Sequence, residues 1–254
     1  MKKNNNPITI YWSPYYPITQ MMSDWSFLYP KPKTLFSELY KNKDKENVGR
    51  SFFTCPAFAD KLKKTLVIRS ATNSSHEYDF TDNKQYLNPI TDLCIELQKI
   101  RQSSVTFGST VSYSLNYMFF AEESVEAYFT PPMFHEPRYT KYASAIPGQF
   151  NIGEWFRPFN FEVQLWKNKG EIHLEENEPL FYVEFQTDRP VILKRFNVTE
   201  TLFRYSNAST WSSSIFGLGD SLSKRYERFK NVGYREKILT EIKKNLVDEE
   251  PYKF

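Results

Sequence analysis

The strongest constraint on the fold of this chain is a regular alternation of side-chain type near its middle. In "VSYSLNYMFF", residues 111–120, apolar or aromatic side chains from Val111 to Phe119 alternate with Ser112, Ser114 and Asn116. Successive side chains of a β-strand point to opposite faces of the sheet, so this period predicts a strand with one buried and one exposed face.

The same period recurs on both sides of this segment and predicts about eight strands with short turns, as in an antiparallel sandwich, a jelly roll or an open barrel. The other segments are "ITIYW", "TLVIRS", "HEYDF", "SVEAYFTPP", "FNFEVQLW", "EIHLE", "LFYVEFQ" and "RPVILKRF". We expect hairpins where "ATNSS", "AEES" and "ENEP" separate neighbouring strands, with Asn177 adopting an unusual backbone angle in the last.

Helices are predicted at both ends of the β-rich region. "KTLFSELYKN" and "CPAFADKLKKT" each predict a short helix, the second capped by Thr54 with Pro56 in its first turn. A further helix is expected from Thr199, and residues 222–247 carry a strong helical period that Gly233 divides. Between these regions, "PITDLCIELQKI" fits a helix or a strand equally well.

These patterns predict a mainly β fold with added α in a single domain. Residues 1–198 would form an antiparallel β-sandwich or jelly-roll-like body with N-terminal loops and short helices. The proline-rich loop of residues 7–33 would be anchored on it by Trp25 and Phe27. Residues 199–254 would form a C-terminal helical segment packed on the body.

The charge is small and unevenly placed. Residues 221–254 hold nine Lys or Arg and six Asp or Glu, whereas the first 220 residues hold 24 of each sign. A neutral body argues against nucleic acid as the partner. The alternative is a weak nucleic-acid binder that uses the basic C-terminal helix, with its four cations Lys224, Arg225, Arg228 and Lys230.

The chain lacks the usual signs of export. No apolar run is long enough to cross a bilayer, and no apolar signal core precedes Pro7. The only cysteines, Cys55 and Cys94, make no disulfide framework and are expected to be reduced, partly buried thiols. We therefore expect a protein that is neither secreted nor membrane-spanning.

The three histidines are the candidates for metal ligands. His173 and Glu175 form a His-x-acid pair, but no histidine follows position 173, so a facial triad cannot close in chain order. A site assembled from distant strands would use His76, His135 and His173 with an acid such as Glu175. The favoured interpretation is structural, with Ile172 and Leu174 in the core and His173 in water; we predict no metal and no cofactor.

Other chemical motifs are incomplete. The chain has no Gly-x-Ser-x-Gly nucleophile elbow, and "FGLGDSLSK" fits a helix start capped by Asp220 or Ser221. Glu154, Trp155 and Arg157 are candidate binding residues, although an Arg stacked on a ring or paired with the acid would also make a structural clamp. No catalytic residue is assigned, which leaves open whether the protein is an enzyme.

Several stretches carry a resemblance to a known family. They are "IYWS", "SFFTCPAF" and "PGQFNIGEWFRPFNFEVQLW" leading to "ENEPLFYVEFQTDRPVILKRF". Together they resemble an uncharacterised protein family of tailed, T-even-like marine bacteriophages of the cyanophage and pelagiphage type, from Ile8 to about Phe196. The resemblance implies a viral gene product in the host cytoplasm, and it supplies no catalytic residue to assign.

The expected function is that of a non-enzymatic bacteriophage protein that works by contact with another protein, as a virion component or a host-factor binder. Its aromatic content of 17% and its neutral body favour such a contact surface. The alternatives are a metal-dependent enzyme on a jelly-roll scaffold and the nucleic-acid binder described above. The oligomeric state stays open.

Overall fold

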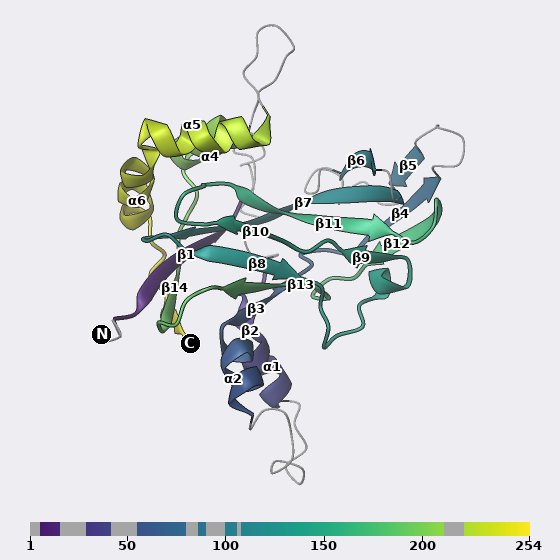
Figure 1. Ribbon diagram of the computed structural model, residues 1–254, viewed down its shortest axis with the longest axis horizontal. Coiled ribbons are helices and arrows are strands. Elements are labelled where there is room, and N and C mark those ends of the chain that lie inside the picture. The colour runs from purple at the N-terminus through teal and green to yellow at the C-terminus, as the bar shows by residue number, and fades with distance from the viewer. Residues whose placement is uncertain are drawn as a thin grey trace, which may run out of the picture.

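In the computed structural model, three β-sheets form a sandwich-like body with helices packed on its outer faces (Figure 1). The structure describes residues 6–15, 29–41, 55–79, 86–89, 100–105, 108–210 and 221–254. The prediction of a mainly β fold with added helices and a sandwich-like body is therefore confirmed.

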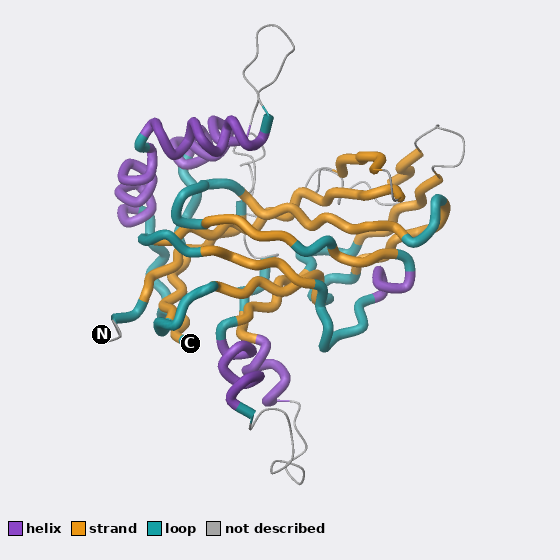
Figure 2. Tube along the Cα trace, in the orientation of Figure 1, coloured by secondary structure: helices purple, strands orange, loops and turns teal. Residues whose placement is uncertain are grey.

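Most strand neighbours pair antiparallel, but β1 and β14 pair in parallel. Figure 2 shows the strands gathered in the body and the helices at its outside. Sheet A runs in the order β15 (Tyr252–Lys253), β14 (Val191–Arg195), β1 (Ile8–Pro14), β7 (Gly108–Ala121), β11 (Pro158–Leu165) and β9 (Ala143–Ala145), with β6 (Ile100–Val105) also paired to β7. Sheet B runs in the order β10 (Gly148–Asn151), β8 (Glu126–Thr130), β13 (Pro179–Phe185), β3 (Thr65–Arg69) and β2 (Lys33–Thr34). Sheet C is β12 (Lys169–Leu174), β4 (Ser74–Asp79) and β5 (Tyr86–Pro89).

Aromatic rings fill the space between sheets A and B. Phe159 on β11 lies with its ring centroid 5.0 Å from that of Phe119 on β7 and 4.7 Å from that of Phe129 on β8. Phe119 also meets Phe185 of β13 edge-on at 5.8 Å. Offset and edge-on aromatic pairs add favourable energy to the burial of their large apolar area. The high phenylalanine content of the chain is thus used in joining the two sheets.

The outer face of β7 departs from the prediction of a half-exposed strand. Its inward residues follow the expected alternation, but Met118 and Phe120 on the opposite face are fully buried as well. Three C-terminal helices cover them: α4 (Glu200–Thr210), α5 (Leu222–Val232) and α6 (Tyr234–Lys244). The uninterrupted apolar run of residues 118–120 was the sign that both faces are buried here.

The three expected hairpins are wrong, because each turn carries the chain from one sheet to another. β3 pairs with β13 and β2, whereas the next strand, β4, pairs with β12 and β5. Likewise β8 pairs with β10 and β13 but not with β7, and β12 and β13 lie in different sheets. Alternation specifies which face of a strand is buried, but it does not specify the neighbouring strand.

The predicted helix boundaries agree closely with the structure. Helices α1 (Leu35–Lys41) and α2 (Pro56–Lys63) pack on the outer face of sheet B, around Val67 and Tyr182. The N-cap residue of α2 is Cys55, where Thr54 was expected, and its side chain makes no capping hydrogen bond. The Cys55 thiol is exposed, although a partly buried one was expected.

Other turn and cap predictions are confirmed. Ser221 accepts the Lys224 N–H at the start of α5, and the Thr199 hydroxyl accepts the Leu202 N–H at the start of α4. Gly233 and Asn177 both have positive φ angles, of 69° and 63°.

Some expectations concern residues outside the described ranges. The residues outside these ranges include Trp25, Phe27, Thr54, Cys94 and nearly all of "PITDLCIELQKI". Among the described helices, none has the length and hydropathy that crossing a membrane requires.

Phe159 provides a test of the packing between sheets A and B. Its side chain is 1% exposed, so Phe159→Ala should leave a cavity and lower the free energy of unfolding by about 3–5 kcal/mol. Urea unfolding followed by fluorescence measures this. The control Met133→Ala, at a side chain 70% exposed, should change stability by no more than about 0.5 kcal/mol. Equal effects of the two changes would contradict the packing described.

Candidate functional site

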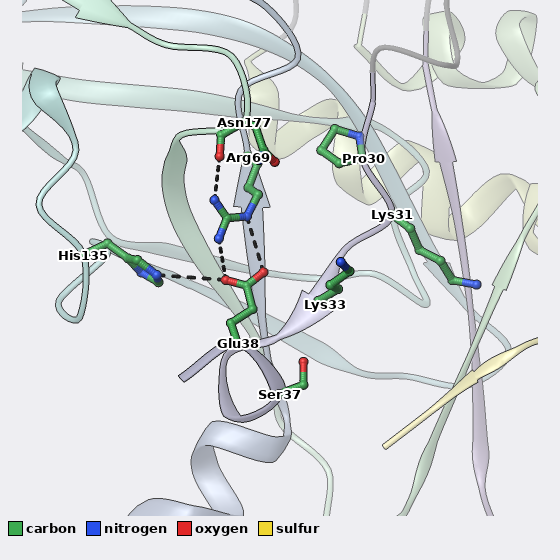
Figure 3. A pocket seen from close by; sticks show the side chains of 8 residues that line it. All are labelled: Pro30, Lys31, Lys33, Ser37, Glu38, Arg69, His135 and Asn177. Atoms are coloured by element: carbon green, nitrogen blue, oxygen red, sulfur yellow. Dashed lines mark hydrogen bonds and ion pairs between the residues drawn. The ribbon is translucent and has the colours of Figure 1, made fainter. Parts of the chain in front are cut away.

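A pocket of about 270 Å³ opens at the edge of sheet B, beside the N-terminal end of α1 (Figure 3). We call it the Arg69 pocket. Its lining residues come from the segment around β2 and α1, from the end of β3, and from the loops around residues 135 and 177. They are Pro30, Lys31, Lys33, Ser37, Glu38, Arg69, His135 and Asn177.

A two-point ion pair forms the wall of the pocket. Arg69 Nε lies 3.3 Å from Glu38 Oε1, and its Nη2 lies 2.5 Å from Oε2. Its Nη1 donates to the backbone carbonyl of Asn177 at 2.5 Å, in the turn where φ is positive. A guanidinium matches a carboxylate with parallel N–H groups, so this pair holds α1, β3 and the 177 turn in one geometry.

His135 lies at the end of a chain of hydrogen bonds on the other side of Glu38. The Phe134 N–H donates to the Tyr182 hydroxyl at 3.1 Å, and that hydroxyl lies 2.6 Å from His135 Nδ1. The hydroxyl can accept from the Phe134 N–H and donate its own hydrogen to Nδ1. With this direction of the bond, which we assign, the ring proton lies on Nε2. Nε2 lies 4.0 Å from Glu38 Oε2.

The surroundings of His135 and Tyr182 favour the neutral form of each side chain. Burial and the nearby Arg69 charge lower the pKa of His135, while the opposing influence of Glu38 is smaller. Burial raises the pKa of Tyr182 to about 12. His135 therefore stands as a neutral hydrogen-bond donor at neutral pH.

The hydroxyl of Ser37 is already engaged. It donates to the Thr34 carbonyl at 2.8 Å, while His135 Nδ1 is bonded to Tyr182. A nucleophile needs a base within hydrogen-bond reach, and these lining residues do not form such a pair. Their arrangement suits binding through charge and hydrogen bonds.

The lysines of the pocket differ in their partners. Lys31 Nζ lies 3.1 Å from Glu249 Oε1 and donates to the Glu250 carbonyl, near the C-terminal end of the chain. Lys33 is exposed on β2, and its ammonium forms no ion pair with any residue that the structure describes.

The structure does not bring the three histidines together. His173 pairs in register with Ser75, and His76 with Ile172, so the two histidines occupy opposite faces of sheet C. His76 is buried against Tyr113, with 5.7 Å between ring centroids. His173 lies outside, with Nε2 3.1 Å from Glu171 Oε2 and Nδ1 2.9 Å from Ser75 Oγ.

The remaining metal candidates lie in other surroundings. Glu175 forms an ion pair with Arg138 at 2.7 Å, and His135 lines the Arg69 pocket. Within the described ranges, no three His, Cys, Asp or Glu side chains gather closely enough to hold a metal ion. Ile172 and Leu174 are buried, as the structural interpretation of His173 expects.

Glu154 and Trp155 hold helix α5 to the corner before β11, and Arg157 stacks on Trp155. The Arg157 guanidinium lies 4.8 Å from the Trp155 ring, which is the predicted stacking. Glu154 accepts a hydrogen bond from the Tyr226 hydroxyl at 2.9 Å and pairs with Lys230 at 2.9 Å. The bonds from Lys230 and Tyr226 lower the pKa of Glu154, so the carboxylate stays charged.

The cations of α5 are placed as the sequence predicts, along one helix. Lys224 and Arg228 are exposed one turn apart, and Arg225 is partly covered. Lys230 is drawn to Glu154 and lies 5.3 Å from the Tyr226 ring. At least one of the four is therefore used in holding the helix.

Sequence reasoning missed most of the Arg69 pocket. No local sequence pattern marks Lys33, Glu38 or Arg69, and the sequence marks His135 only as a candidate metal ligand. These residues lie on separate strands, helices and loops, and nothing in their local spacing marks that they converge. Asn177 was recognised as a turn residue, but the use of its carbonyl by Arg69 depends on the fold.

The burial of His76 generates a prediction for stability. Neither ring nitrogen of His76 hydrogen-bonds to a described residue, and burial lowers its pKa from the ordinary 6.5. Below about pH 6.5 the unfolded chain therefore binds a proton that the folded chain does not, and stability falls as the pH falls. His76→Phe should remove part of this loss and raise the free energy of unfolding at pH 7 by about 1 kcal/mol.

Urea unfolding of both proteins at pH 8.0 and pH 5.5 measures the effect. The wild type should lose more stability between these two values than the variant does. An equal loss in both would show that His76 is not a buried neutral ring.

The comparisons with known proteins assign no family. No protein-family model matches the chain, and no curated protein matches it either. Its function is therefore inferred from the Arg69 pocket and the surface around it.

Proposed function

We propose that this chain is a non-enzymatic binding protein that acts through contact with another protein, using the face that holds the Arg69 pocket. The observation that carries the proposal is the loop of residues 131–137, here called the Met133 loop. It leaves Met133 70% exposed and Phe134 41% exposed beside the charged pocket. Met, Phe and Arg are enriched in protein interfaces, and clustered exposed apolar side chains mark contact sites.

A further exposed aromatic side chain lies on β8, the strand that precedes the Met133 loop. Ala127 and Phe129 of β8 pack into the core, so Tyr128 between them faces outward and is 36% exposed. The Met133 loop follows β8 directly, and its His135 lines the pocket. Apolar side chains and a charged pocket thus lie next to each other on one face, the usual combination of an interface anchor and a specificity pocket.

The existing hydrogen bonds and ion pair of the pocket side chains support a role in binding over one in catalysis. Glu38 is bound by Arg69, the Ser37 hydroxyl by the Thr34 carbonyl, and His135 Nδ1 by Tyr182. Because these groups are already fixed in position, little conformational entropy is lost when a ligand binds. In keeping with the resemblance to phage proteins, the proposed partner is a virion component or a host factor in an infected bacterium.

The proposal is tested with the full chain and a purified partner. Proteins retained from infected cells are identified, remade in pure form and titrated by calorimetry. Met133→Lys should weaken binding at least about tenfold, because interface anchors contribute most of the binding energy. The matched control is Val232→Lys, at a side chain 51% exposed. It lies at the end of helix α5, on the side of the body opposite to α1 and α2 (Figure 1).

The control should bind like the wild type. Equal affinity for both variants, or the lack of any protein that binds after purification, would contradict the proposal.

A further inference from the structure

Among the described residues at the Arg69 pocket, one positive charge is in excess. Glu38 neutralises Arg69, and Glu249 neutralises Lys31. Lys33 is the lining cation for which no described residue supplies a counter-charge. The pocket therefore complements a ligand with a single negative charge, and the carboxylate of Glu38 disfavours a more highly charged anion such as a phosphate dianion.

Two of the lining residues have hydrogen-bond donors that the contacts above do not use. Three of the N–H groups of Arg69 are used by Glu38 and Asn177, and a guanidinium has five. His135 Nε2, assigned as N–H, lies 4.0 Å from its nearest recorded carboxylate oxygen, beyond hydrogen-bond distance. Figure 3 shows the Lys33 amine and the His135 ring on either side of the Arg69–Glu38 pair.

The size of the pocket fits a small group attached to a larger partner. Its volume of about 270 Å³ lies just below the range of about 300–1,000 Å³ typical of pockets for drug-sized ligands. One amino-acid residue with its carboxylate is a suitable occupant. The exposed side chains of Met133 and Phe134 beside the opening offer contact to an apolar neighbour of that residue.

From these observations we propose that the Arg69 pocket binds a single carboxylate of the partner protein, either a C-terminal carboxylate or an acidic side chain, next to an apolar residue. This rests on the proposed function as a protein-binding protein. Lys33 provides the attracting charge, and Arg69 and His135 provide oriented N–H donors. The Arg69–Glu38 pair holds the donors in place before the ligand arrives, which lowers the ordering cost of binding.

The test uses small probes on the full chain labelled with ¹⁵N and followed by NMR titration. The probes are N-acetyl-leucine, with a terminal carboxylate, and N-acetylglutamate α-amide, with a side-chain carboxylate only. N-acetyl-leucinamide, without a carboxylate, and inorganic phosphate are the comparison compounds. At least one carboxylate probe should shift the Arg69 Nε–H and Phe134 amide signals, and the better of the two identifies the source of the carboxylate.

Lys33→Gln should weaken carboxylate binding at least fivefold while the spectrum stays that of a folded protein, because Lys33 is an exposed side chain. Lys167→Gln, at an exposed turn between β11 and β12, is the matched control and should bind like the wild type. The proposal is overturned if N-acetyl-leucinamide or phosphate binds as tightly as the carboxylates, if no carboxylate binds, or if Lys33→Gln has no effect.

Failure of this inference differs from failure of the proposed function. If no carboxylate probe binds but Met133→Lys still weakens partner binding, the carboxylate inference is wrong and the protein contact stands. If the probes bind while Met133→Lys leaves partner binding unchanged, the proposed contact face is wrong and the pocket binds small carboxylates alone.

Discussion

The burial of the C-terminal part of β7, residues 117–121, on both faces is the constraint on which the rest of the structure depends. This strand pairs with β1 and β6 along one edge and with β11 along the other. Its inward residues, such as Phe119, fill the space between sheets A and B, and Met118 and Phe120 on its other face are covered by the C-terminal helices. A strand that is buried on both faces needs a layer of secondary structure against each face. Sheet B is the layer on one side, and helices α4 to α6 form the layer on the other.

Sheet B repeats this arrangement on a smaller scale and thereby builds the Arg69 pocket. Its outer face buries Val67 and Tyr182 under α1 and α2. That packing brings Glu38 of α1 against Arg69 at the end of β3. Tyr182 serves twice, because its ring packs in this small core and its hydroxyl orients His135. The pocket is therefore a direct consequence of how the helices dock, and its donors are held by rigid elements.

The sequence could predict the elements of this fold much better than their partners. Strands can be predicted because apolar and polar residues alternate where one face of a strand lies against the core. The helix starts at Thr199 and Ser221 can be predicted because these side chains form local hydrogen bonds. Strand pairing is decided by contacts between distant segments, and for this reason the prediction of three hairpins between adjacent strands is wrong. The pocket was missed for the same reason. Arg69 reads as the last residue of an ordinary strand until α1 and the 177 turn are packed beside it.

The most direct test of the central claim, that the Arg69 pocket receives a carboxylate, is a crystal structure of the full chain grown with N-acetyl-leucine and, separately, with N-acetylglutamate α-amide. The account predicts, in at least one of them, a carboxylate within hydrogen-bond distance of His135 Nε2 or of an Arg69 N–H that Glu38 and Asn177 do not use, with the Arg69–Glu38 pair intact. A pocket without ligand in both crystals, or a ligand bound by its acetyl group with the carboxylate in solvent, would contradict it.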